Sequence, residues 1–206
     1  MKLELNENFE SIEKWLEENL SNDNSFTPHI DLIPKIKEKG IYFWFMKPGG
    51  YLALSPFVTI KPIEPRYSKM INGELCDLVY LGTAGVRNNS SGINNGTLLQ
   101  RFNWHLIENQ NESSVLSGIM STFRRTIIPL FSNDLLIDNE QIKLDDLFKK
   151  LFNIYYLVYP GDFNQIASTV RIDESILIDK LRPIFNIKDN DNIYDVNHLT
   201  YKIQQR

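Results

Sequence analysis

The pair Arg101 and His105 has the residue types and the spacing that anion chemistry requires. The two residues stand four positions apart in a segment with helical periodicity, so their side chains fall on one face of the predicted helix. Arginine stays charged and binds phosphate oxygens as a fork, and histidine exchanges a proton near neutral pH. The alternative is a surface arginine beside a partly buried histidine.

A carboxylate, Glu174, lies in an apolar helical segment that ends before Pro183. Carboxylate oxygens suit Mg²⁺ or Mn²⁺, and one carboxylate with waters and phosphate oxygens is sufficient for Mg²⁺. Asp173 is a rival ligand, although a helix directs neighbouring side chains about 100° apart. The alternative for Glu174 is a solvated glutamate on the helix surface.

Two tyrosines stand beside glycines in apolar segments that read as strands. Tyr42 follows Gly40, and Tyr80 precedes Gly82. Glycine lets the backbone approach closely or bend at such places. Tyrosine in a strand is ordinarily core material. Beside a metal ion and an arginine, however, a tyrosine hydroxyl is expected to have a pKa below ~10 and to take a proton from water.

Taken together, Gly40-Ile41-Tyr42, Tyr80-Leu81-Gly82 and the later polar residues resemble the motifs of the GIY-YIG nuclease superfamily. The most specific part is E-x-x-L-I-x-x-x-R-P-x-F-N, which runs from Glu174 to Asn186. The resemblance implies a metal-dependent endonuclease that hydrolyses DNA phosphodiester bonds. The catalytic residues that it implies are Tyr42, Tyr80, Arg101, His105, Glu174 and Asn186.

The resemblance also implies a role for each of these residues. Tyr42 would be the general base, and Tyr80 would orient phosphate or water. Arg101 would stabilise the phosphorane, and His105 would act as base or proton relay. Glu174 would bind Mg²⁺ or Mn²⁺. Asn186 would position the site.

The spacing departs from the pattern of typical members, whose two motif halves form one hairpin. Tyr80 comes 38 positions after Tyr42, and Glu174 comes 69 positions after His105. A catalytic domain over residues 40–190 is therefore expected to carry insertions at about 48–76 and 110–150. Residues 1–39 are expected to form an N-terminal helical extension packed on this core, and residues 191–206 a C-terminal helical segment.

The apolar periodicity predicts an α+β domain, with a small and mostly antiparallel sheet flanked by helices. Strands are expected at 40–47, 51–61, 77–82 and 154–159. Helices are expected at 8–20, just before Gly40, at 98–109 after a Thr97 cap, at 114–125, at 143–152, around Glu174 and at 194–204.

Composition narrows the class of protein. The chain has 206 residues, a net charge of −4 and one cysteine, which excludes an internal disulfide and a cysteine-rich zinc site. The sequence has neither a signal core nor an apolar run of ~18 residues. We therefore expect no membrane association, and we expect a cytoplasmic location. Basic residues outnumber acidic ones between 35 and 125, and a local basic face can bind DNA.

Arg87, Arg124 and Arg125 are the expected DNA contacts, although a solvated helix end is the alternative for the last two. Resemblance to stand-alone restriction endonucleases implies double-stranded DNA as partner, with a homodimer or sequential nicking. The alternative is a catalytically weak or inactive nucleic-acid or protein-binding module. RNA or branched DNA would engage the same residues.

Overall fold

The computed structural model describes residues 8–52, 66–85, 88–89, 92–93, 96–106, 123, 143–161 and 163–186. The elements up to the centre of the chain are α1 (Phe9–Asn19), β1 (Ser25–Phe26), β2 (Lys39–Met46), α2 (Gly49–Leu52), β3 (Ser68–Ile71) and β4 (Glu74–Ala84). The elements that follow are β5 (Asn88–Asn89), β6 (Gly92–Ile93), α3 (Leu98–Leu106), α6 (Lys143–Leu151), β7 (Phe152–Tyr159) and α7 (Phe163–Leu181).

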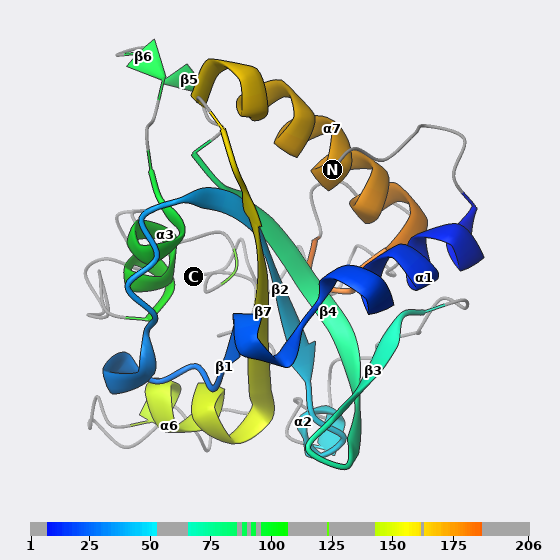
Figure 1. The fold of residues 1–206 in the computed structure, drawn as a ribbon. Coiled ribbons are helices and arrows are strands. Elements are labelled where there is room, and N and C mark those ends of the chain that lie inside the picture. The colour runs from blue at the N-terminus through cyan, green and yellow to red at the C-terminus, as the bar shows by residue number, and fades with distance from the viewer. Residues whose placement is uncertain are drawn as a thin grey trace, which may run out of the picture.

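Five antiparallel strands form one sheet in the order β1-β7-β2-β4-β3 (Figure 1). β2 is the central strand and pairs along its length with β7 on one side and β4 on the other. Helices flank this sheet, so the predicted α+β fold with an antiparallel sheet is confirmed. In the described part of the chain, none of the helices is long and apolar enough to cross a bilayer.

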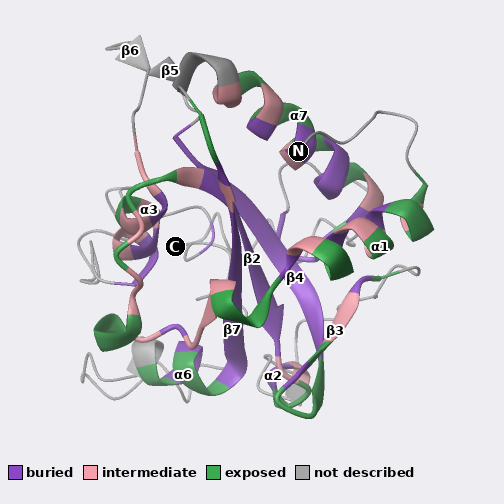
Figure 2. Ribbon diagram, in the orientation of Figure 1, coloured by how far each residue is buried: buried purple, intermediate pink, exposed green. Residues whose placement is uncertain are grey.

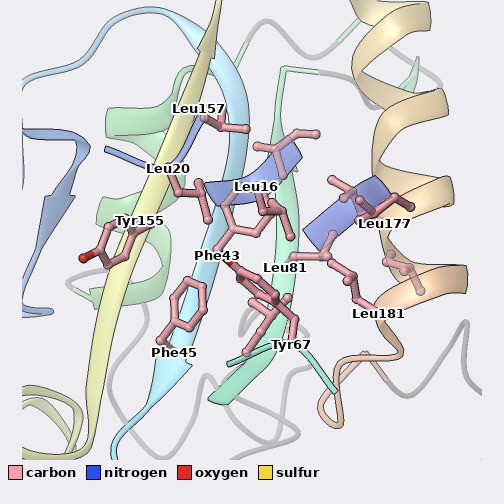
Figure 3. Packing of buried hydrophobic residues seen from close by; sticks show 14 of the residues in the cluster. Leu16, Leu20, Phe43, Phe45, Tyr67, Leu81, Tyr155, Leu157, Leu177 and Leu181 are labelled. Carbon is pink, nitrogen blue, oxygen red and sulfur yellow. The ribbon is translucent and has the colours of Figure 1, made fainter. Parts of the chain in front are cut away.

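Helices cover both faces of the sheet, with α3 and α6 on one face and α1 and α7 on the other (Figure 1). We call these the α3 face and the α7 face. Along β2, Tyr42 and Trp44 point to the α3 face, whereas Phe43 and Phe45 point to the α7 face. Figure 3 shows this second pair packed near Leu16 of α1. Because both faces are buried (Figure 2), β2 reads as a continuous apolar run.

A β-bulge in β4 places Tyr80 on the α3 face. Trp44 pairs with Tyr80, but Phe45 pairs with Leu78, so Val79 is an extra residue. Both Val79 and Tyr80 consequently lie in the α3-face cluster. Strict alternation from Leu78 would have sent Tyr80 to the α7 face, and the bulge therefore redirects this side chain toward Tyr42.

Several elements differ from the sequence prediction. Residues 51–52 belong to α2 instead of a strand, after a turn in which Gly50 N–H donates to Lys47 O, and 53–61 lie outside the described residues. In place of the helix predicted just before Gly40, the structure has a 3₁₀ turn at Ile30–Leu32 and no helix over residues 33–38. β1 and β3 were not predicted. β3 forms a hairpin with β4 through Asn72 and Gly73, both with positive φ.

The predicted helix after Thr97 is confirmed as far as Leu106. Thr97 Oγ1 accepts from Gln100 N–H at 3.2 Å, and Gln100 Oε1 accepts from Thr97 N–H at 2.8 Å. This reciprocal pair is a capping box, which satisfies two backbone donors at the helix start. Of the helix predicted over 114–125 only Phe123 is described, and it is helical; the helix predicted over 194–204 lies outside the described residues.

Candidate active site

Four elements bring the predicted site residues together at one end of the sheet. The Tyr42 hydroxyl of β2 is hydrogen-bonded to His105 Nε2 of α3 at 2.8 Å. The Tyr42 and Tyr80 ring centroids are 6.3 Å apart. Arg101 and Glu174 lie close enough to shift the pKa of both phenols by their charges. Residues that are far apart in the sequence thus share one site.

His105 lies in an aromatic environment on the α3 face. Its side chain is 1% exposed, and its ring centroid lies 5.2 Å from that of Tyr42, 5.9 Å from Trp44 and 5.7 Å from Phe123. Its hydrogen bond with the Tyr42 hydroxyl links it to the other site residues. This geometry suits proton relay through Tyr42 rather than direct contact with a large substrate.

A lowered tyrosine pKa was predicted beside a metal ion and an arginine, whereas in the metal-free protein the pKa of both site tyrosines is raised. Tyr42 is fully buried, and burial raises the pKa of its hydroxyl above 10.0. The positive charge of Arg101 lowers this pKa and the negative charge of Glu174 raises it, but burial is the largest effect. Burial likewise raises the pKa of Tyr80. Near neutral pH both phenols keep their protons, so a role as base requires transfer from Tyr42 to His105 Nε2.

Close backbone and side-chain approaches explain the motif glycines. A Cβ on Gly82 would stand 2.5 Å from the Tyr42 Oη atom, so the phenol reaches over Gly82. A Cβ on Gly40 would stand 1.8 Å from the carbonyl oxygen of Leu157 in β7. Any larger residue at either position would displace the strand or the phenol.

Thr83 contacts two of the charged residues, and sequence reasoning did not identify it. Its hydroxyl donates to Glu174 Oε2 at 3.1 Å. Its carbonyl oxygen accepts from Arg101 Nε at 3.2 Å. The only sequence signal was a hydroxyl residue directly after the motif glycine, which is too common to point to a site.

Asn186 completes the outer edge of β4. β3 pairs with β4 only as far as Asp77. Beyond it, Phe185 N–H donates to Val79 O at 2.7 Å, Asn186 Oδ1 accepts from Leu81 N–H at 2.9 Å, and Asn186 Nδ2 donates to Leu81 O at 2.8 Å. The buried primary amide replaces a neighbouring strand. Its contacts therefore hold the strand that carries Tyr80, in keeping with a positioning role.

Glu174 is better placed than Asp173 to bind a cation. Asp173 is fully buried and accepts from the Tyr159 hydroxyl at 2.7 Å, whereas Glu174 is half-buried. The described residues contain no group of three or more His, Cys, Asp or Glu side chains that could hold a metal. A carboxylate beside a threonine hydroxyl is an all-oxygen donor set, which fits Mg²⁺ or Mn²⁺ completed by water and phosphate oxygens.

The predicted DNA contacts Arg87, Arg124 and Arg125 lie outside the described residues. Near the site, the segment before β2 carries the exposed Lys35 and Lys37. Its backbone is attached to the first turn of α3, where Leu98 N–H donates to Glu38 O and Leu99 N–H donates to Ile36 O, both at 2.9 Å. The backbone that carries these two lysines is therefore held beside the helix that carries Arg101.

Comparison with known proteins agrees with the geometry. A family profile described as the GIY-YIG catalytic domain matches residues 40–206, which is well over half of the chain. No curated protein and no solved structure matches the chain significantly. The profile spans the segments that supply Tyr42, Arg101 and Glu174 to the site. The chain therefore belongs to the GIY-YIG catalytic-domain family.

Proposed function

We propose that this protein is a divalent-metal-dependent endonuclease that hydrolyses phosphodiester bonds of double-stranded DNA. Membership of the family supports nuclease activity in general. The observation that carries the proposal is the convergence of a phenol, a guanidinium and a carboxylate from β2, α3 and α7 at one end of the sheet. Phosphodiester hydrolysis needs these groups together to orient water, neutralise charge and hold the phosphate.

The burial of the side chains suggests the order in which they meet the substrate. Arg101 and Glu174 are half-buried, whereas Tyr42 is fully buried and Tyr80 almost so. A phosphate group would therefore contact Arg101 first, and the guanidinium would stabilise the charge that develops on its oxygens. Glu174 would hold the divalent cation, which supplies further charge neutralisation at the phosphate.

Proton transfer would use the contact between Tyr42 and His105. In this scheme Tyr42 Oη takes a proton from the attacking water as its own proton passes to His105 Nε2, 2.8 Å away. Tyr80 would orient the water or phosphate beside it. Because burial raises the pKa of Tyr42, the histidine is needed as the acceptor.

A restriction-type role on duplex DNA is the finer part of the proposal. Lys35 and Lys37 would contact the DNA backbone beside the site, because phosphate affinity depends on local positive charge. A chain with one such site cuts two strands either as a homodimer or by sequential nicking. The second candidate is an inactive binding module, which the complete burial of Tyr42 favours.

Plasmid cleavage in Mg²⁺ or Mn²⁺ tests the proposal. We expect the wild-type protein to cut, and Glu174→Ala and Tyr42→Phe to lose most of the activity. Glu18→Ala, at an exposed position of α1, is the matched control and should cut normally. Absence of cleavage on plasmid, branched DNA and RNA would support the binding module. Cleavage by Glu174→Ala at the wild-type rate would remove Glu174 as the metal ligand.

A further inference from the structure

We propose that Thr83 is a positioning residue that holds the Glu174 carboxylate and the Arg101 guanidinium in a fixed relation to each other. Its hydroxyl donates to Glu174 Oε2 at 3.1 Å, and its carbonyl accepts from Arg101 Nε at 3.2 Å. One residue of β4 thus contacts both charged groups. The inference rests on the proposed function of the same site and adds a residue to which that function assigned no role.

The architecture explains why such a residue is needed. Arg101 belongs to α3 and Glu174 to α7, and these helices lie on opposite faces of the sheet (Figure 1). Thr83 pairs with Ile41, whose side chain lies in the α7-face cluster, so the threonine side chain also faces α7. Its carbonyl oxygen instead lies at the outer edge of β4, where Arg101 Nε reaches it. Thr83 therefore gives both helices a common reference point.

The residue type suits the task. Thr83 is 9% exposed, so competition from bulk water for its hydroxyl is weak. A β-branched side chain in a strand has a restricted χ1, which holds the hydroxyl in place better than serine would. Glutamate has three rotatable side-chain bonds, and a hydrogen bond to Oε2 removes much of that freedom. A partner that orients a metal ligand in this way typically changes metal affinity or activity by about 10- to 100-fold when it is removed.

A purely structural role would give a different result. In that case the hydroxyl would only dock α7 on the sheet, as the nearby hydrogen bond from Tyr159 to Asp173 does. Loss of such a bond lowers stability but leaves the response to metal unchanged. Tyr159→Phe is therefore the matched control, because it removes a hydroxyl that contacts the residue next to Glu174 on the same helix.

The test measures Mn²⁺ binding to the DNA-free protein by electron paramagnetic resonance and, separately, the Mg²⁺ concentration that half-saturates cleavage. Thr83→Val replaces the hydroxyl with a methyl group. We expect it to weaken Mn²⁺ binding and to raise the half-saturating Mg²⁺ concentration by about 10-fold. Thr83→Ser should stay within about threefold of wild type, and Tyr159→Phe should match wild type in both measurements.

The Thr83→Ser and Thr83→Ala pair repeats the test if the valine variant does not fold, because these two variants differ only by the hydroxyl. Equal Mn²⁺ affinity and Mg²⁺ dependence in the serine and alanine variants, in a protein that cuts DNA, would overturn the role of Thr83 and leave the proposed function intact. A wild-type protein that neither binds Mn²⁺ nor cuts would overturn the proposed function and this inference together.

Discussion

The two ends of β4 each hold a carboxylate, an arginine and a hydroxyl, but the groups are connected differently. At one end, Asp77 accepts from the Tyr51 hydroxyl at 2.8 Å and the Ser68 hydroxyl at 2.6 Å, and pairs with Arg66 Nη1 at 2.9 Å. At the other end, Glu174 and Arg101 both contact Thr83.

The difference separates two uses of the same residue types. Asp77 is buried and its charge is neutralised by an arginine that it contacts directly, which is what a structural carboxylate requires. Glu174 is half-buried, and both Glu174 and Arg101 are hydrogen-bonded to Thr83. The first arrangement stabilises the β3–β4 hairpin, and we propose that the second presents both charges to a ligand. Substitution at matched positions can test this contrast.

Glu174→Gln should have the largest effect. The amide keeps the shape of the side chain but removes the charge proposed to hold the cation, so we expect the single-turnover cleavage rate to fall by about 100- to 1,000-fold. The free energy of unfolding should change by less than about 0.5 kcal/mol, because the side chain is partly exposed. Denaturant unfolding provides that second measurement. A stability loss comparable to that of an Asp77 variant would contradict the contrast.

Arg101→Lys should have the next largest effect. Lysine keeps the charge but lacks the Nε donor and the fork, so the contact with the Thr83 carbonyl and the bidentate grip on phosphate are both lost. We expect a rate reduction of about 10- to 100-fold in single-turnover cleavage. The matched substitution Arg66→Lys should leave the rate unchanged, and a similar loss there would place Arg66 in the site.

Asp77→Asn should affect stability instead of cleavage. The substitution removes the charge that pairs with Arg66 from a buried position of β4, so we expect the free energy of unfolding to fall by about 1–2 kcal/mol. Chemical denaturation measures this change, and the cleavage rate of the folded protein should stay within about twofold of wild type. If Asp77→Asn lost cleavage activity but kept the stability of the wild type, Asp77 would have a functional role and the contrast between the two ends of β4 would be wrong.

Of these changes, a rise in pH should have the smallest effect as long as the pH stays near neutral. At alkaline pH it should destabilise both ends of β4 through their buried tyrosines. Burial raises the pKa of Tyr42, Tyr80 and Tyr51 above 10.0. A phenol with a higher pKa in the folded state contributes stability that is complete below pH ~10 and is lost as pH rises toward the folded value.

Absorbance at 295 nm, recorded with circular dichroism, checks the prediction. We expect most tyrosines to ionise together with unfolding. Independent ionisation near pH 10 in a protein that stays folded would show that these phenols are accessible to water.

The sequence was sufficient for elements whose signal is local. The apolar run of β2 and the Thr97 cap before α3 need no knowledge of distant residues, and both were predicted. β1 and β3 were missed because short strands at a sheet edge depend on pairing with partners far along the chain. The positions of Tyr42 and Glu174 could be predicted from motif residues, but the raised pKa of Tyr42 could not, since burial depends on the assembled aromatic cluster.

Thr83 shows why the rest of the site was out of reach. The strand register sets Thr83 opposite Ile41, and the rotation of α7 turns Glu174 toward its hydroxyl. Its carbonyl oxygen lies at the edge of β4, where Arg101 reaches it. Each of these is a relation between elements. The bulge at Val79 is similar, because one extra residue changes which face Tyr80 occupies.

The register between β2 and β4 has a consequence for evolution and engineering. Tyr42 faces Gly82 because β2 pairs with β4 on one side and with β7 on the other. This register does not depend on the length of chain that joins the two motif halves. Searches that demand a fixed gap between the two tyrosines will overlook relatives built in this way. Variants with a longer or shorter joining stretch after α2 are therefore expected to keep Tyr42 opposite Gly82.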